Sequence, residues 1–215
     1  MFKHFFSAVI FLLLITNISF SQFRVGFSGE ITSATYGGVA PANAAYQSIA
    51  GFGGSLIAEV RIVKNVYLSL QPGFITNGSK IKFGNENNLF NDTVVTFTIN
   101  QSYFTLPLNL KIFSNRFYVG AGVSALFLSS ANVKQDDTDN EKEIKDQFKN
   151  YDIVSNFNVG YQIPIGKPYL FFELRYLQGL ININNENTVS KKEIYIENFK
   201  SKGFSFITGI IYPLK

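Results

Sequence analysis

The chain has 215 residues and a formal net charge of +4; 46% of its residues are hydrophobic, only 16% are charged, and it contains no cysteine, no tryptophan and a single histidine. Without cysteine there is no disulfide framework, no thiolate zinc site and no thiol nucleophile. The basic residues are scattered rather than gathered in a stripe, which argues against a nucleic-acid-binding protein, and a mean hydropathy of +0.10 is too low for a protein of many membrane-spanning helices.

The first 21 residues have the pattern of a secretory signal peptide. Lys3 and His4 form a short cationic start, residues 5–15 form an apolar run, and Ser19 and Ser21 are small residues at the positions that a signal peptidase reads. A membrane anchor needs about 18 to 20 uninterrupted apolar residues, and polar residues interrupt this run from position 16. We therefore expect cleavage of residues 1–21, which removes the only histidine and leaves one exported domain at residues 22–215.

From residue 23 onward, apolar residues alternate with polar or small residues, a pattern typical of β-strands with two different faces. Eight segments show it, at 23–31, 51–62, 66–74, 95–112, 119–127, 153–163, 169–183 and 204–212. In the seventh segment, Leu174 and Tyr176 lie on one face and Glu173 and Arg175 on the other. In the segment 95–112 the parity changes near residues 100–102, which predicts either a bulge or a strand that continues beyond the membrane.

The connections between these segments alternate in length. Three are tight turns of turn-forming residues, at 63–65, 114–116 and 166–168, and four are long, at 37–48, 84–93, 132–150 and 184–198. This alternation is typical of outer-membrane barrels, which have short periplasmic turns and long extracellular loops. The sequence thus predicts an all-β fold, an eight-stranded antiparallel up-and-down transmembrane β-barrel in the outer membrane, as a monomer.

The polarity of the two strand faces favours a barrel in lipid over a soluble barrel. The charged residues share a face with glycines, so we expect that face to line a narrow, filled lumen while the apolar face contacts lipid. Four charges of each sign are expected to pair there as a structural network, with a proton or ion path as the alternative: Arg24, Arg61, Lys111 and Arg175 with Glu30, Glu59, Asp152 and Glu173. Without tryptophan, the inner aromatic girdle would consist of Phe23, Phe117, Tyr161, Phe172 and Tyr212.

Several short motifs occur in a characteristic order along the chain. They are EVRI at 59–62, LQPGF at 70–74, YFTLPLNLK at 103–111, GAG at 120–122, ELRY at 173–176 and GLINI at 179–183. In these motifs the chain resembles the PorT-like outer-membrane β-barrel family over essentially all of residues 22–215. The resemblance implies an eight-stranded outer-membrane barrel in a family mostly without an assigned activity. The association of its namesake with protein secretion does not transfer on fold alone.

The residues after the signal peptide do not favour catalysis, a metal or a cofactor. Acyl-transfer and protease sites normally need a histidine base, which this part of the chain lacks. Glu59 and Glu173 could act as an acid/base pair only if one were protonated, and arginines two residues away favour the ionised form of both. The acidic stretch 136–141 faintly resembles a calcium loop but lacks the glycine at its sixth position, so we expect a solvated loop.

Three functional hypotheses remain open. The leading one is a non-enzymatic barrel that stabilises the membrane or presents its loops to an envelope protein partner; the others are a narrow pore for small solutes or ions and a soluble periplasmic barrel that binds an apolar ligand. Lysines near the predicted outer rim could also contact lipopolysaccharide phosphates in the surrounding lipid, with ordinary solubility as the alternative: Lys80, Lys82, Lys191, Lys192, Lys200 and Lys202.

Overall fold

The computed structural model of the protein describes residues 22–38, 40, 44–84, 95–136, 141–185 and 199–214. The predicted signal peptide, residues 1–21, lies outside these ranges. The strands are β1 (Phe23–Gly38), β2 (Ala44–Gln47), β3 (Ile49–Val63), β4 (Val66–Leu70), β5 (Gly73–Phe83), β6 (Val95–Ser114), β7 (Phe117–Gln135), β8 (Glu141–Glu143), β9 (Tyr151–Pro164), β10 (Tyr169–Gly179) and β11 (Phe199–Pro213), with a 3-10 turn at Lys145–Gln147.

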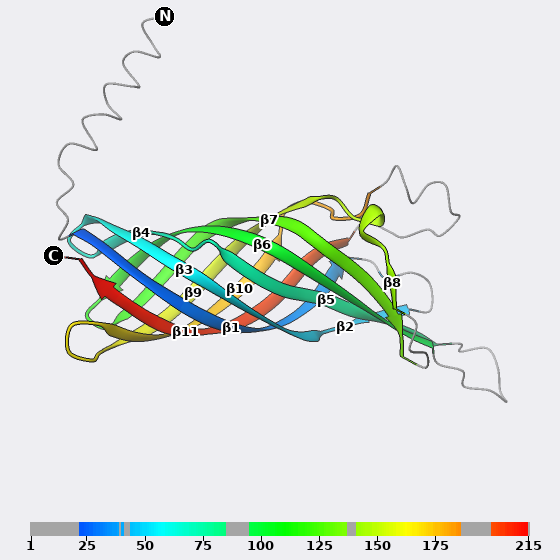
Figure 1. The fold of residues 1–215 in the computed structure, drawn as a ribbon, viewed down its shortest axis with the longest axis horizontal. Helices are drawn as coiled ribbons and strands as arrows, with labels where there is room; N and C mark the ends of the chain where they lie inside the picture. Colours follow the sequence, from blue (N-terminus) through cyan, green and yellow to red (C-terminus); the bar gives the residue numbers. More distant parts are fainter. Residues whose placement is uncertain are drawn as a thin grey trace, which may run out of the picture.

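These strands form a closed barrel of eight antiparallel strands, as the sequence predicted (Figure 1). β2 continues into β3 and β4 into β5, so each of these pairs makes one strand of the barrel, while β8 lies outside the ring beside β7. Every barrel strand pairs with its neighbours in chain order, and β1 pairs with β11 to close the ring. Among the described residues, no helix is long and apolar enough to cross a membrane.

The strands are strongly staggered around the barrel. Paired residues can be followed once around the ring from Val25 through Ala58, Leu70, Leu108, Val123, Ser155, Gln178 and Lys202. The last pair returns to Thr35, ten residues further along β1, so the shear number is ten. A shear of this size requires the strands to tilt by about 40° against the barrel axis.

The tight turns lie together at one end of the barrel, beside the first and last described residues (Figure 1). Asn115, in the turn between β6 and β7, has a φ of 57°, and Gly166, between β9 and β10, has a φ of 72°. Asparagine and glycine adopt this left-handed conformation more readily than other residues, which allows the chain to reverse within a few residues. In outer-membrane barrels the short turns lie on the periplasmic side, and this end is called the inner rim below.

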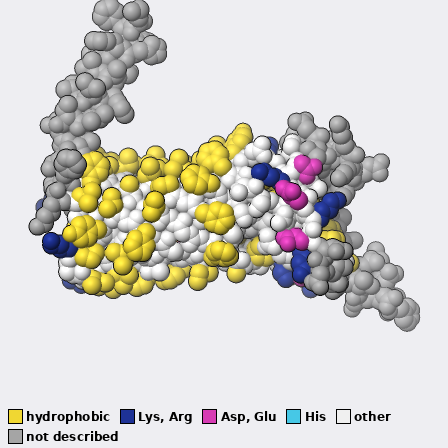
Figure 2. All heavy atoms as spheres, in the orientation of Figure 1, with side chains coloured by type: hydrophobic (Ala, Val, Ile, Leu, Met, Phe, Trp, Pro, Cys, Tyr) yellow, Lys and Arg dark blue, Asp and Glu magenta, His cyan; other side chains and the backbone are white. Residues whose placement is uncertain are grey.

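The outward faces of the strands form an apolar wall (Figure 2). On β9 the outward apolar residues run from Ile163 to Tyr151, which covers roughly 30 Å along the axis at about 3.3 Å per residue and the tilt given above. This height matches the hydrocarbon thickness of a membrane. Phenylalanine and tyrosine occur near both edges of the wall. Phe117 packs against Tyr161 near the inner rim, and Phe74, Phe104 and Phe127 are cross-strand neighbours toward the outer side.

Beyond the wall, β5, β6 and β7 continue as an extension on the outer side. In this extension Phe97 and Ile99 face inward whereas Thr98 and Asn100 face outward. The polarity inverts because the outer surface now meets water instead of lipid, which explains the parity change in the sequence. The side chains of β6 still alternate inward and outward without interruption, and only the polarity of the two faces changes. The bulge at this level lies in β7, where Ser129 is the extra residue.

An apolar core fills the outer half of the lumen, which differs from the expected plug of charges. Its buried members are Tyr36, Ile75, Ile99, Tyr103, Leu126, Leu128, Ala131, Ile144, Phe148, Val154, Ile183 and Phe199. Ile144 and Phe148 come from the region predicted as the loop 132–150, which instead contains β8 and the 3-10 turn. The long connection 132–150 is therefore partly structured, and two of its large apolar side chains pack into the barrel mouth.

Candidate functional site

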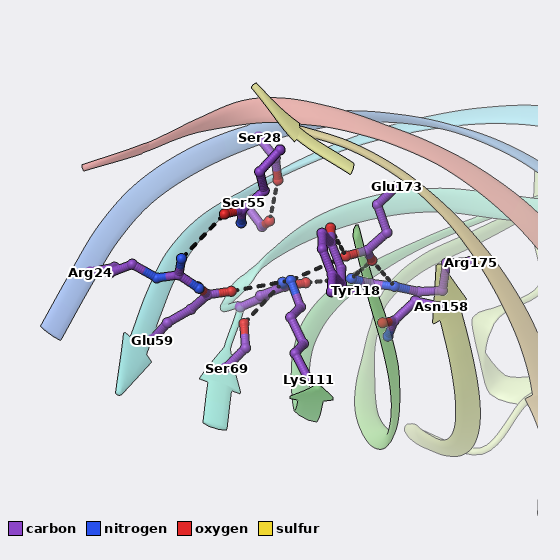
Figure 3. A network of polar contacts seen from close by, with 12 residues as sticks. Arg24, Ser28, Ser55, Glu59, Ser69, Lys111, Tyr118, Asn158, Glu173 and Arg175 are labelled. Carbon is purple, nitrogen blue, oxygen red and sulfur yellow. Dashed lines mark hydrogen bonds and ion pairs between the residues drawn. The ribbon is translucent and has the colours of Figure 1, made fainter. Parts of the chain in front are cut away.

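A chain of five alternating charges crosses the inner half of the lumen (Figure 3). Arg24 contacts Glu59 at 2.5 Å, and Glu59 Oε1 lies 3.2 Å from Lys111 Nζ. Lys111 Nζ lies 3.1 Å from Glu173 Oε2, and Glu173 Oε1 contacts Arg175 at 2.5 Å. The side chains of Glu59, Lys111 and Glu173 have no exposed surface. These residues come from β1, β3, β6 and β10, so the chain of charges joins opposite walls of the barrel.

Strand register and lumen width bring these side chains together. Arg24 and Glu59 are direct cross-strand neighbours on β1 and β3. Lys111 projects from β6 into the lumen and reaches Glu173 on β10, because an eight-stranded barrel is narrow enough for side chains to span it. Buried ions are tolerated only when they are paired and hydrogen-bonded, so the alternating order of the charges satisfies a physical requirement of this site.

Uncharged polar residues complete the network, and the sequence analysis did not single them out. Tyr118 donates its hydroxyl proton to Glu173 Oε2 at 2.7 Å. Arg24 donates to Gln162 Oε1 at 3.2 Å, and Arg175 donates to Gln71 Oε1. All three partners have the parity of the lumen face, which was the available signal, but parity does not indicate the level along the barrel at which a side chain lies.

Aromatic rings close the inner end of the lumen below the charges. The Arg24 guanidinium lies 3.8 Å from the centre of the Tyr67 ring and 4.9 Å from that of Phe113. The Phe113 ring in turn packs against Tyr67 at 5.0 Å and Tyr118 at 4.9 Å between centres. Rings beside a desolvated cation stabilise it electrostatically and fill the space around it. Arg24 is therefore held between an anion and an aromatic cluster.

Three of the eight predicted network residues do not join this chain of ion pairs. Glu30 is half-buried, accepts a hydrogen bond from Ser205 and interacts electrostatically with Arg175, two strands away around the ring. Asp152 is buried, but it accepts a hydrogen bond from Ser201 at 2.6 Å and forms no ion pair among the described residues.

Arg61 is half-buried near the inner rim and likewise forms no ion pair with a described residue. The physical reason is the level of each residue along the axis. Asp152 lies six residues further out on β9 than Asn158, the residue paired with Arg175, and Arg61 lies two residues nearer the inner rim than Glu59. Both have the correct parity for the lumen but lie above or below the charges.

Between the charge network and the outer apolar core lies a cavity of about 40 Å³. Glu30, Arg175, Asn77 and Thr105 contribute to its lining. Apolar residues such as Ile75, Leu126 and Val154 line the rest of it, and a space of this size holds one or a few water molecules beside the polar groups. The described residues thus give the lumen two closures, a charged and aromatic one inside and an apolar one outside, separated by a small cavity with a mixed lining.

At the outer rim, the lysines have different environments. Lys80 Nζ pairs with Asp136 at 3.1 Å, and Thr98 donates to the same carboxylate at 2.8 Å. The Thr98 hydroxyl and the Lys80 ammonium lower the pKa of the Asp136 carboxyl below its ordinary value. Lys200 donates to the Leu180 carbonyl oxygen at 3.1 Å.

Lys82 and Lys202 are exposed, whereas Lys191 and Lys192 lie outside the described residues. Of the acidic stretch 136–141, residues 137–140 also lie outside them, and Asp136 is engaged by Lys80 and Thr98. Within the part of the chain that the structure describes, no group of three or more acidic residues, histidines or cysteines could hold a metal ion.

The chain is similar to several solved barrel structures. Neisserial surface protein A is 11% identical to this chain in sequence, with a TM-score of 0.43, and the match covers 90% of this chain and 97% of the neisserial protein. The attachment invasion locus protein Ail of Yersinia pestis has 9% identity and a TM-score of 0.38, with 89% and 98% covered. The N-terminal β-barrel domain of Pseudomonas aeruginosa OprF has 13% identity and a TM-score of 0.34, with 86% and 96% covered.

No curated protein matches the chain. A family model for the outer membrane protein beta-barrel domain matches residues 16–185, which is more than half of the chain. The match agrees with the closed eight-stranded ring, the apolar outer wall and the charged lumen described above. The chain therefore belongs to the outer membrane protein beta-barrel domain family and is a protein of the outer membrane.

Proposed function

We propose that the protein is a non-conducting, non-enzymatic outer-membrane barrel whose outer extension presents a rigid surface to an envelope protein partner. The observation that carries the proposal is the double closure of the lumen. Five charged side chains and an aromatic cluster fill the inner half, and an apolar core fills the outer half. A barrel closed at both levels does not act through its lumen, so its available surfaces are the wall and the rim.

The outer extension has the properties of an interaction platform. β5, β6 and β7 remain paired beyond the wall, up to the pair of Phe83 with Val95 and the pair of Gln135 with Phe97. Ile99, Tyr103 and the inserted Phe148 support this sheet from within as part of the apolar core. A sheet with its own core keeps its outer face in one conformation, which lowers the entropic cost of binding a partner.

The two other hypotheses fare differently. The soluble periplasmic barrel is wrong, because the chain belongs to an outer-membrane family and its outward strand faces are apolar. The narrow pore would need a continuous aqueous path through the lumen. The side chains of Lys111, Glu59 and Glu173 cross the lumen and have no exposed surface, which does not fit such a path. The closures therefore favour a silent barrel over a pore.

Current measurements in planar lipid bilayers test the closed lumen. The folded protein, verified in the same sample by a gel mobility that changes on boiling, is expected to give no steady single-channel current. A double variant, Tyr103→Ala with Tyr118→Ala, removes one aromatic ring from each closure and is expected to give brief channel openings. Phe104→Ala, whose ring faces the lipid, serves as the matched control and should remain silent. Steady current through the unaltered protein would refute the proposal.

Three finer assignments accompany this proposal. The motifs at 103–111 and 173–176 support membership of the PorT-like group within the family, and the pattern of residues 1–21 supports cleavage before Gln22, which N-terminal sequencing of the exported protein tests. The exposed Lys82 and Lys202 support contact of the outer rim with lipopolysaccharide phosphates.

A further inference from the structure

The lipid-facing wall has an apolar groove toward its outer edge, where β1, β3, β10 and β11 lie side by side. The groove has a volume of about 330 Å³. Its floor includes the small outward residues Ser33 and Ala50, which are cross-strand neighbours. Phe204, which pairs with Ser33 from the other side, forms one edge. Small residues between large ones create this depression in an otherwise convex wall.

Large apolar side chains line the remainder of the groove. Ile31 is 65% exposed, Leu174 is 58% exposed and Phe206 is 46% exposed, and all three face outward. These residues belong to the part of the wall that contacts hydrocarbon, so water does not fill the groove in the membrane. The groove therefore has the shape and polarity to hold a hydrocarbon chain along the barrel wall.

Two lysines lie directly above the groove on the same face. Lys202 is two residues beyond Phe204 on β11, is exposed, and pairs with Gln178 of β10. Lys200 follows two residues further out, with one ammonium proton donated to Leu180. Glu30 of β1 and Glu173 of β10 interact with Arg175 on the lumen face, whereas Lys200 and Lys202 have the outward parity of Phe204, so these two carboxylates do not neutralise the lysines.

We infer that this groove is a binding site for lipid A, the phosphorylated anchor of lipopolysaccharide, with one acyl chain along Ser33 and Ala50 and a phosphate at Lys202 and Lys200. The order of the chemistry along the axis carries the inference. An apolar channel at membrane depth continues into two ammonium groups at the polar boundary, which complements a lipid that has acyl chains below and phosphates above. Among the described residues on the opposite side of the barrel, Lys80 is paired with Asp136.

The absence of tryptophan from the sequence permits a direct measurement with one introduced reporter. Phe204→Trp places the reporter at the edge of the groove, and Phe104→Trp places a matched control at an outward position of β6, where the native ring is 50% exposed compared with 62% for Phe204. Each variant is folded into vesicles of brominated phosphatidylcholine, which quenches tryptophan fluorescence. Unbrominated lipid A is then added in increasing proportion.

Lipid A that occupies the groove displaces the quencher from the reporter. We expect fluorescence to recover at Phe204→Trp at a mole fraction of lipid A at least about fivefold lower than at Phe104→Trp, the factor for one lysine near a phosphate. Adding Lys200→Gln and Lys202→Gln to the first variant should remove this difference, whereas Lys82→Gln should preserve it. Lipid A without phosphates should lose the advantage as well.

Equal recovery at the two positions would overturn the site. A difference that persists without the two lysines, or without the lipid phosphates, would overturn it equally, because the groove would then select acyl chains alone. Gel mobility before and after boiling verifies that each variant is folded. The measurement does not depend on whether the lumen conducts, so its outcome is separate from that of the bilayer currents.

Discussion

Replacing Lys111 with methionine tests whether the lumen charges act as one network. The Lys111 ammonium lies 3.2 Å from Glu59 and 3.1 Å from Glu173, and no part of its side chain is exposed. Methionine has a similar length and fills the same space without a charge. The substitution therefore removes two ion pairs while it keeps the packing against Tyr118 and Phe171, whose ring centres lie 4.8 Å and 5.8 Å from Nζ.

The expected loss follows from opposing terms. At an effective dielectric constant of about 20, each ion pair near 3 Å contributes roughly 5 kcal/mol, so Lys111 gains about 10 kcal/mol from both carboxylates. Removing the ammonium also removes its own desolvation penalty, which is several kcal/mol. Glu59 and Glu173 keep Arg24 and Arg175 as partners. The net expectation is a loss of about 3 to 5 kcal/mol in the free energy of unfolding.

Urea unfolding of the barrel in lipid vesicles, followed by far-ultraviolet circular dichroism, measures this loss. Arg61→Gln is the matched control, because Arg61 is half-buried and has no ion pair among the described residues; its effect should stay within about 0.5 kcal/mol. The double variant Lys111→Met with Glu59→Gln should lose at least about 1 kcal/mol less than the sum of the two single variants. If Lys111→Met is as stable as Arg61→Gln, the network does not stabilise the barrel.

Two further predictions concern the packing around Tyr118 and the charge at the outer rim. Gly160→Ala should destabilise the barrel by about 1 to 3 kcal/mol, because a Cβ at this position would overlap the Tyr118 ring. Gly29→Ala should be nearly neutral, since the nearest heavy atom to a Cβ there is 3.9 Å away. The same urea titrations compare the two variants, and equal stabilities would contradict the steric reasoning. The pKa of Asp136 is lowered in the folded protein, so its ionised form stabilises the outer extension. This contribution is fully present at pH values above the ordinary carboxyl pKa near 4, and it disappears as the pH falls through the lowered pKa. Nuclear magnetic resonance titration of its carboxyl carbon should show Thr98→Val raising that pKa, and an unchanged value would show that the hydrogen bond has no influence.

The sequence by itself determined the number of strands, their two faces and the short turns at one rim. These features are local, because side chains alternate every residue and a wall in lipid must be apolar on one side only. The alternation in residues 169–183 was sufficient to place Glu173 and Arg175 in the lumen and Leu174 in the wall. The change of parity before Phe104 likewise marked the point where the strands leave the membrane.

Only the tertiary structure decided which lumen residues meet. Parity places a side chain inside the barrel, but its level depends on the shear number, which results from the hydrogen-bond register of all eight strands together. The offset of ten residues around the ring brings Arg24, Glu59 and Lys111 to one level and leaves Asp152 well above it. The apolar outer core depends on the same global geometry, because Phe148 joins it from a connection that lies over the mouth of the closed barrel.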